Sequence, residues 1–434
     1  MSAEATAEEL SKIEFAEPTG VAFAVGFFFA FRSFIIVLSV HLLGTEPRTG
    51  TALSLVTDYL LLLVVAFSSL WKAHLPIREM LRLASVRWAL LFIGFSGVSL
   101  LWSITVSPWT SLAYWCEMAA DVAIVAMLLR AGPVKTVCAA LMEGYVWGAC
   151  AIAVSAWIMP AQSDLRLGDE ELFGANSIGY ICGFAFFFAQ YVMREAKKRV
   201  MAPAFLLAVT LLRTLSKTTI AAFLVGQGFL LLRDKSLSRK GKILTILATL
   251  IVVAASWGLL SSYYDIYTNA GNQSVTLTGR IGIWAYMLAE AIERPWIGHG
   301  FDSVWRVVPP FGEDQFEAPH AHNELLQQFY AYGSVGVCMF TGIYVSLFRH
   351  IRQLAAGPLR SFFIAFLLFI LVRGIADTER FDLSLPLWSI VMISLLIEQA
   401  RTTQPEAPEV LAVHPSPLAM LPQNLSIANE DPAN

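Results

Sequence analysis

The sequence has little charge for its length. Asp, Glu, Lys and Arg make up 15% of its 434 residues, whereas a soluble protein carries about 25%. The shortfall accompanies 56% hydrophobic residues, which fall in repeated long runs. This pattern excludes an ordinary soluble domain and indicates an all-α polytopic membrane protein. The net charge of -3 gives no reason to expect a nucleic-acid partner.

Cysteine is also scarce. The five cysteines lie inside apolar runs and lack metal-ligand spacing, which argues against both a disulfide framework and a zinc site: Cys116, Cys138, Cys150, Cys182 and Cys338. The first 18 residues lack the basic n-region of a cleavable signal peptide, so we expect the first apolar run to stay as an anchor. No internal repeat is visible, although transporters often show repeated halves.

Twelve apolar segments are predicted to span a membrane. They are Val21–Leu43, Ala52–Leu70, Trp88–Ile104, Leu112–Leu129, Val134–Met159, Ser177–Met193, Pro203–Leu215, Thr219–Leu232, Ile243–Leu260, Glu324–Phe348, Ser361–Arg373 and Pro386–Gln399. The predicted organisation is a disordered cytoplasmic tail (1–18), spans 1–9 (19–261), one long periplasmic loop (262–323), spans 10–12 (324–400) and a second disordered cytoplasmic tail (401–434).

The orientation follows from the loops rich in Lys and Arg, which stay in the cytoplasm. These loops lie near residues 72–87, 130–135, 194–199, 233–242 and 349–360. If 203–232 were a single span, the basic clusters at 194–199 and 233–242 would face opposite sides. Two short antiparallel segments keep both clusters in the cytoplasm, and both termini with them.

The two short segments predict a sunken turn. Each arm of 203–232, counted with its half of the turn, has about 16 residues and so reaches about 24 Å at 1.5 Å per residue, less than the roughly 30 Å of hydrocarbon. The turn from Arg213 to Thr218 should therefore lie below the outer surface, where it must be buried in protein or line a cavity. With Arg280 and Arg373, its cations Arg213 and Lys217 predict an outward-facing cationic cavity. Intramembrane cations are costly unless paired, and an anionic ligand would explain them.

Arg280 stands in the first turn of a helix predicted to begin at Thr278 and to end before Pro295. The helix dipole disfavours a cation there, so the guanidinium is better explained by an anion than by helix stability. We expect Ile281, Trp284, Ala285, Leu288 and Ile292 to form the buried apolar face of this helix. The alternative is a solvated loop arginine.

His320 and His322 precede the span that begins near Glu324. The positive end of that helix lowers an imidazole pKa and favours the neutral form. A neutral imidazole can accept a proton from a sugar hydroxyl. The alternatives are an interfacial histidine that only hydrogen-bonds and a metal set of His320, His322 and Glu324, with His299 as a fourth member. That spacing matches none of the strong ligand patterns, so no metal or other cofactor is predicted.

Other polar residues have two interpretations each. Arg213 and Lys217, four residues apart, would share a helical face towards the ligand or snorkel to the interface. Asn176 lies in the small-residue stretch 173–179 and serves as a helix cap or a substrate contact. Asp377 belongs to an outer acidic loop near Arg373 that also holds Glu379, Arg380 and Asp382. This loop supplies surface charges or partners for the cavity cations.

Three acidic residues lie inside predicted spans. Glu117 and Asp121 are four residues apart, and Glu143 lies in the next span. We expect them to form a buried ion-pair network with Arg32. A proton relay is the alternative.

These motifs together resemble the superfamily of O-antigen ligases and Wzy/ExoQ-type polysaccharide polymerases. The resemblance covers about residues 174–336 and rests on the following elements: Gly174-Ala175-Asn176-Ser177-Ile178-Gly179, Ser216-Lys217-Thr218, Thr278-Gly279-Arg280 with Trp284, Arg294-Pro295, Gly298-His299-Gly300-Phe301, His320-Ala321-His322-Asn323-Glu324 and Gly333 to Gly336. Ligases tend to carry Ser-Arg where this chain has Ser216-Lys217, which favours the polymerase branch.

The resemblance implies a GT-C-like glycosyltransferase of the bacterial inner membrane that works at the periplasmic face without a metal. The donor would be an oligosaccharide on undecaprenyl diphosphate, and the acceptor a sugar hydroxyl. His322 would activate the acceptor, while Arg280 and Lys217 would hold the diphosphate. The residues expected to bind substrate are Arg213, Asn176, His320, Asn323 and Arg373. Chain-length regulator and export proteins are the implied partners.

Three other functions compete with this prediction. An O-antigen ligase would transfer glycan to lipid A core. A polysaccharide transporter or flippase would use the intramembrane charges, but the cations here cluster at the outer boundary. A non-catalytic partner in export would show no activity on lipid-linked donor.

Overall fold

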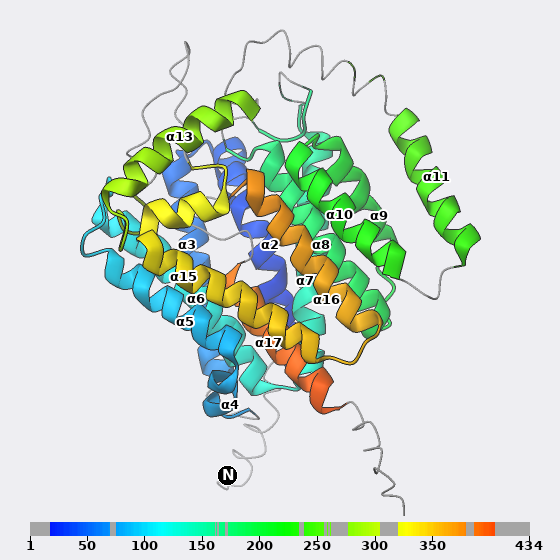
Figure 1. The fold of residues 1–434 in the computed structure, drawn as a ribbon, viewed down its shortest axis with the longest axis horizontal. Coiled ribbons are helices and arrows are strands. Elements are labelled where there is room, and N and C mark those ends of the chain that lie inside the picture. The colour runs from blue at the N-terminus through cyan, green and yellow to red at the C-terminus, as the bar shows by residue number, and fades with distance from the viewer. Residues whose placement is uncertain are drawn as a thin grey trace, which may run out of the picture.

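The computed structural model describes residues 18–69, 75–160, 162, 165–169, 172–233, 238–255, 258, 261, 277–303, 320–378 and 386–403. Over these ranges the chain is all-helical, and Figure 1 shows the helices gathered into one bundle except for α11 (Arg239–Ala255), which stands apart at the right. Most of the two predicted disordered tails, half of the predicted periplasmic loop, and the charged residues Glu379, Arg380 and Asp382 lie outside the described residues. The described residues 401–402 belong to the last helix, so the second predicted tail begins too early.

Each predicted span overlaps one helix. The helices are α2 Pro18–Leu43, α3 Pro47–Ser69, α4 Ile77–Arg82, α5 Ala84–Ser99, α6 Pro108–Ala131, α7 Val134–Ile158, α8 Ala175–Glu195, α9 Met201–Arg213, α10 Lys217–Arg233, α11 Arg239–Ala255, α13 Leu277–Glu293, α15 Glu324–Gln353, α16 Pro358–Ala376 and α17 Leu387–Thr402. By length and composition, α2, α3, α6, α7, α15 and α16 can each cross a membrane.

Glycines let α2 and α7 pack backbone to backbone. A Cβ at Gly26 would collide with the carbonyl of Leu141, and a Cβ at Gly144 with the carbonyl of Phe23. Small residues at such crossings permit the close approach that membrane helices use where apolar surface alone gives little preference. This pair forms one side of the bundle core.

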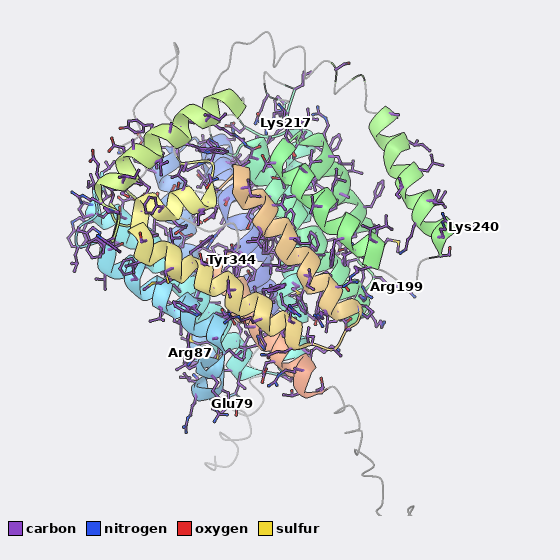
Figure 2. The ribbon with its side chains drawn as sticks, viewed as in Figure 1. Glu79, Arg87, Arg199, Lys217, Lys240 and Tyr344 are labelled. Carbon is purple, nitrogen blue, oxygen red and sulfur yellow. The ribbon has the colours of Figure 1, made fainter. Side chains whose placement is uncertain are left out.

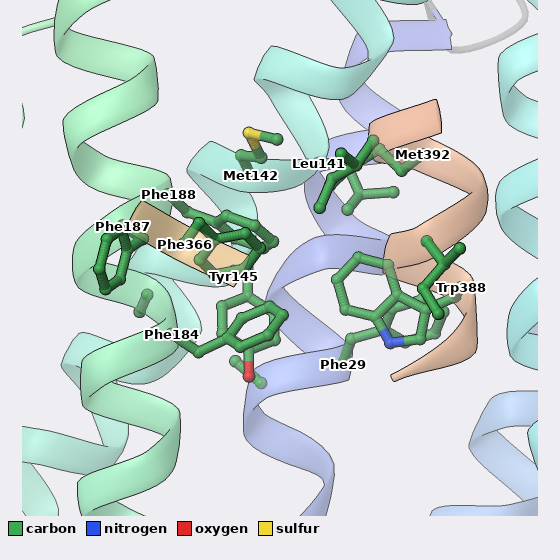
Figure 3. Packing of buried hydrophobic residues seen from close by; sticks show 14 of the residues in the cluster. Phe29, Leu141, Met142, Tyr145, Phe184, Phe187, Phe188, Phe366, Trp388 and Met392 are labelled. Atoms are coloured by element: carbon green, nitrogen blue, oxygen red, sulfur yellow. The ribbon is translucent and has the colours of Figure 1, made fainter. Parts of the chain in front are cut away.

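Aromatic side chains fill the middle of the bundle (Figure 3). Phe184 of α8 packs edge-on against Phe188 at 4.8 Å and against Phe366 of α16 at 5.0 Å between ring centroids. Trp388 of α17 lies 5.1 Å from Phe29 of α2 and 6.0 Å from Tyr145 of α7. Such ring pairs add stability beyond the area they bury, so α2, α7, α8, α16 and α17 are held in a fixed relation.

The predicted turn between the two short segments is present. Helix α9 ends at Arg213 and α10 begins at Lys217, with Leu215 in the left-handed region at φ 55°. Thr214, Leu215 and Ser216 are all buried. Burial within protein is the condition under which such a turn is tolerated at membrane depth.

A second irregular segment, residues 294–301 after α13, packs against α15 and is called the docking segment below. A Cβ at Gly298 (φ 61°) would lie 2.5 Å from the backbone of Ala331, and Gly333 (φ 62°) is the non-helical residue that kinks α15. Backbone hydrogen bonds tie the two stretches together, including His299 N to Tyr330 O at 3.0 Å. A side chain at either glycine would meet main chain, so these positions require glycine.

The predicted apolar face of α13 is wrong. Ile281, Leu288 and Ile292 are exposed, whereas Ile283 and Met287 are buried. The buried face packs on Tyr330 of α15 and on Ala321. The predicted face differs from the buried one by one position along the sequence, because the helix is apolar on more than one side. The correction matters for the site, since Arg280 shares the buried face with Ile283 and Met287.

The intramembrane network is confirmed for two of its three predicted acids. Nη1 of Arg32 lies 2.8 Å from Asp121 and 3.3 Å from Glu117. Glu143 instead pairs with Lys198 of the basic loop after α8, at 3.5 Å. The predicted network therefore contains one residue too many.

Candidate functional site

The residues proposed for catalysis meet at one end of the bundle. This is the end at which α10, α13 and α15 begin and α16 ends. In Figure 2, Lys217 lies at the upper end of the molecule, whereas Arg87 and Arg199 lie lower down. Residues that are far apart in the sequence, such as Lys217, Arg280 and His322, are therefore brought to the same end by the packing of four helices.

His322 is held by the turn that starts α15. It has φ 49°, in the left-handed region that histidine visits more readily than most residues. The next residue, Asn323, caps the helix: its Oδ1 accepts from Leu326 N at 2.9 Å, and its Nδ2 donates to Ile375 O at 2.9 Å. Asn323, predicted to bind substrate, thus ties α15 to the end of α16 and orients the adjacent histidine.

A carboxylate stands behind the imidazole. Nδ1 of His322 lies 3.5 Å from Oδ1 of Asp377, and Oδ2 of Asp377 lies 3.5 Å from Nη2 of Arg373. The guanidinium of Arg373 covers the ring of Tyr180 at 3.9 Å from its centroid, a cation–π contact. Arg373 is fully buried, so it acts on the site through Asp377.

The charges around Asp377 keep it ionised. Burial alone would raise its pKa, but Arg373, His322 and His320 outweigh burial and hold the pKa below its usual range. The pKa of His320 is lowered to about 3 by burial and by the neighbouring His322, Arg373 and Arg280. His320 is therefore neutral near pH 7. Its ring lies edge-on to that of His322, with centroids 4.1 Å apart.

Arg280 projects into the same region from the buried face of α13. Its Nη1 donates to Thr218 Oγ1 at 3.3 Å and to the carbonyl of Ala376. Its Nε is buried and has no hydrogen-bond partner among the described residues. A buried guanidinium N–H without an acceptor is costly, and an oxyanion at this position would satisfy it.

Lys217, Arg280 and Arg166 form a cation cluster, and Arg166 was not among the predicted site residues. Arg166 donates to the Thr214 carbonyl at 3.1 Å and to Oδ1 of Asn176. Lys217 lies within electrostatic range of both Arg166 and Arg280. The only sequence signal for Arg166 was its place in a loop that topology should keep poor in basic residues.

Two predicted substrate contacts lie around this turn. Nη1 of Arg213 donates to the carbonyl of Leu165, so Arg213 braces the loop before α8. Asn176 lies in the first turn of α8 and accepts from Arg166. Both residues shape the cation cluster. Tyr180 was missed altogether, because an aromatic residue in an apolar span carries no signal of its own.

The alternative metal site contains Asp377 in place of the predicted Glu324. Ligand atoms of His320, His322 and Asp377 all lie within 4.8 Å of one another, so these three residues have the geometry to hold a metal ion. Glu324 instead accepts from Thr378 at 2.7 Å. Arg373 at 3.5 Å from Asp377 opposes a divalent cation here electrostatically.

His299 belongs to the docking segment. It is buried and stacks on Tyr330 with ring centroids 4.3 Å apart. Its Nδ1 lies 3.2 Å from the Tyr330 carbonyl. Burial is the main reason that the pKa of His299 is lowered. The imidazole thus supports the kinked part of α15.

Comparison with known families matches the central part of the chain. Residues 202–341 match the family model described as O-Antigen ligase. The matched stretch contains Lys217, Arg280 and His322, while Arg373 and Asp377 follow it. A search of the curated proteins gave no match. Residues 202–341 thus carry an O-antigen ligase domain, which supports the O-antigen ligase-like superfamily, whose members are glycosyltransferase-like ligases and polymerases; the several membrane-length helices of the chain suit a multi-pass membrane protein.

Proposed function

We propose that this protein polymerises lipid-linked oligosaccharide repeat units into exopolysaccharide at the periplasmic face of the bacterial inner membrane. The observation that carries the proposal is the meeting of the His322–Asp377 pair with Arg280 and Lys217 at one end of the bundle. A base beside a set of cations suits the transfer of a sugar from a diphosphate to a hydroxyl.

In the proposed reaction, Nε2 of His322 accepts the proton of the acceptor hydroxyl. The hydroxyl oxygen forms a bond to the anomeric carbon of the donor, and the bond from that carbon to the diphosphate oxygen breaks. The diphosphate departs with the electron pair. Asp377 stabilises the imidazolium through Nδ1, 3.5 Å away. The buried Nε of Arg280, with Lys217, stabilises the charge that grows on the leaving group.

The reaction as proposed needs no metal, because fixed cations take the place that a divalent ion holds in many phosphoryl-leaving reactions. Attack on the side opposite the diphosphate would invert the anomeric carbon. The measurement is turnover of undecaprenyl-diphosphate oligosaccharide by purified protein with and without EDTA. Loss of turnover in EDTA, restored by a divalent ion, would transfer the role to the His320–His322–Asp377 set.

The proposed topology has twelve spans, cytoplasmic termini, and the 262–323 loop in the periplasm between spans 9 and 10. It places positions 217, 280 and 322 outside and positions 87 and 199 inside. Single cysteines at these positions, in a background without the five native cysteines, would be tested with a membrane-impermeant maleimide on intact cells and on inverted vesicles. Labelling of 217, 280 and 322 from different sides would end the proposal.

The activity itself is tested by His322→Ala, Arg280→Ala and Lys217→Ala, each in a strain whose own copy is deleted. We expect all three to lose high-molecular-weight polymer while membrane levels persist. His350→Ala is the matched control, because His350 also pairs with a carboxylate (Glu398, 3.2 Å) but lies at the other end of α15. Normal polymer from all three site variants would remove the assignment.

The same strains separate the competing functions. Loss of long polymer with single units still made indicates a polymerase, whereas free polymer beside uncapped lipid A core indicates an O-antigen ligase. Repeat units trapped on the cytoplasmic side indicate a flippase. Turnover of lipid-linked donor by the purified chain excludes a non-catalytic role, and its co-purification with chain-length regulator and export proteins would test the proposed partners.

A further inference from the structure

A cavity of about 380 Å³ lies between helices and is lined by none of the residues proposed for catalysis. Its walls come from α2, α6, α7, α8 and the first residues of α17, together with the loop ahead of α8. Its volume falls within the range of about 300–1,000 Å³ that is usual for ligand sites. The cavity is therefore large enough for a small molecule or for part of a larger one.

This cavity is separate from the proposed reaction site. Tyr180 belongs to its wall, and the Arg373 guanidinium lies over the Tyr180 ring at 3.9 Å from the centroid. Arg373 is fully buried and contacts Asp377, which contacts Nδ1 of His322, each at 3.5 Å. These three side chains stand between the cavity and the imidazole, so a ligand in the cavity is not a substrate of the proposed transfer.

The polar groups at the cavity carry more negative than positive charge. Among the described residues that line it, Arg32 is the one basic residue, and its Nη1 lies 3.3 Å from Glu117 and 2.8 Å from Asp121. Asp58 of α3 is fully buried and interacts electrostatically with Arg32. One guanidinium thus faces three carboxylates, and these four residues are called the acidic cluster below.

Asp58 indicates that the acidic cluster is short of positive charge. Neither of its carboxylate oxygens accepts a hydrogen bond from a described residue, and the carboxylate lies within hydrogen-bonding reach of that of Asp121. Two carboxylates that face each other do not both stay ionised unless a cation lies nearby, and otherwise they share a proton. Even with one shared proton, the acidic cluster keeps one negative charge in excess. A buried excess charge is costly unless a ligand of opposite charge pairs with it, so the cavity favours a ligand with a single positive charge.

Aromatic rings form much of the remaining wall. Two of them already interact with cations, because Arg32 lies over Phe29 at 5.7 Å and Arg373 lies over Tyr180. Phe29 also packs against Trp388 at 5.1 Å in the core shown in Figure 3, so this wall is preformed. Aromatic faces are the usual partners of an organic ammonium, whereas a bare metal ion would leave most of the cavity empty. The aromatic lining residues are Phe29, Tyr114, Tyr145, Phe173, Tyr180 and Trp388.

We propose that this cavity binds a primary ammonium group, carried by a small amine or by the head group of a phospholipid. The carboxylates of Glu117 and Asp121 accept its N–H groups, and the aromatic rings bind its charge. A primary ammonium suits the site better than a quaternary one, which has no N–H to donate. The inference does not depend on the proposed function, because binding requires no turnover.

The experiment measures binding of radiolabelled ethanolamine to the full chain in phosphatidylglycerol nanodiscs by scintillation proximity, with empty nanodiscs as the blank. The competitors are unlabelled ethanolamine, ethylene glycol and glycolate, which have nearly the same size and are cationic, neutral and anionic at pH 7. We expect ethylene glycol to require at least about a tenfold higher concentration than ethanolamine, since it makes no charge-assisted hydrogen bond. Glycolate should not compete.

Two variants locate the bound amine. Glu117→Gln should raise the Kd for ethanolamine about tenfold, the effect of losing one charge-assisted hydrogen bond. Ser33→Phe fills the cavity without changing its charge and should abolish binding, which covers the case that Glu117→Gln does not fold. Glu143→Gln is the matched control, because Glu143 pairs with Lys198 and does not line the cavity.

The source of the ammonium group is decided by the lipid. If the head group occupies the cavity, nanodiscs of phosphatidylethanolamine should raise the apparent Kd for free ethanolamine, whereas an unchanged Kd assigns the cavity to a soluble amine. Binding should be the same in His322→Ala, so a failure of the proposed function leaves this inference standing. The absence of displaceable ethanolamine, equal competition by ethylene glycol, or an unchanged Kd in both cavity variants would overturn it.

Discussion

Asp377→Asn is the change that most directly tests how the site works. The carboxylate lies 3.5 Å from His322 Nδ1 and 3.5 Å from Arg373 Nη2, and its side chain is 3% exposed. In the proposed reaction His322 takes a proton from the acceptor, and Asp377 would stabilise the new positive charge. Asparagine keeps the size of the side chain and removes the charge, so the effect on the rate reports this interaction.

The magnitude follows from the distance. Opposite unit charges 3.5 Å apart attract by about 5 kcal/mol at an effective dielectric constant of about 20. The imidazole carries roughly half of its final charge while the proton is in transit, so the transition state loses about 2 kcal/mol, or about 30-fold in rate. His322→Ala removes the base itself and should cost about 10²–10⁴-fold.

The assay is polymer formation by purified protein at saturating donor, with kcat and KM measured separately. We expect Asp377→Asn to lower kcat by about 30-fold with little change in donor KM. In the double variant with His322→Ala, the second change should cost nothing further, because Asp377 acts through His322.

Glu398→Gln is the matched control. Glu398 also lies between a histidine and an arginine, 3.2 Å from His350 and 2.7 Å from Arg401, but outside the site. Asp377→Asn also leaves the buried Arg373 without its carboxylate, so melting temperature must be followed alongside the rate. A kcat within twofold of wild type in folded Asp377→Asn, or additive losses in the double variant, would refute the pairing.

Three other outcomes follow from the structure. Gly333→Ala, at φ 62° and against the Trp296 backbone, should destabilise the protein by about 1–3 kcal/mol, seen as a lower melting temperature; Gly282→Ala, in open space, should not. His320 has a pKa of about 3 in the folded protein, so between pH 6.5 and pH 3 the unfolded chain binds one more proton than the folded chain. The free energy of unfolding should therefore decrease as the pH is lowered, by at most about 1.4 kcal/mol per pH unit. A melting temperature that decreases as steeply in His320→Gln would contradict this. Lys217→Arg should keep most polymer synthesis and Lys217→Gln should lose it, and equal rates for both would show that the charge is not used.

A helix over each of the twelve apolar segments and the buried turn at 214–216 were predictable from the sequence, because they depend on local hydrophobicity and on the distribution of basic residues; six of these helices are long and apolar enough to cross a membrane. The structure also confirms the predicted proximity of Arg280 to the turn before Lys217. Both cations lie in segments where topology disfavours basic residues, which is why the sequence predicted a common site for them. The hydrogen bond from Arg280 to Thr218 is the physical form of that link.

Only the tertiary structure decided which residues support His322 and the cations of the candidate site. Asp377 was one acid among several in an outer loop, and its role came from the end of α16 packing beside the start of α15. The buried face of α13 could not be assigned from the sequence, because the hydrophobic pattern of a helix that is apolar on several sides does not indicate which side is buried. Tyr180 carries no sequence signal of its own, and Arg166 only its place in a loop expected to be poor in basic residues, since their partners lie on other segments of the chain. Hydrophobic patterning places helices in a membrane, but the side chains that meet between them are set by how those helices pack.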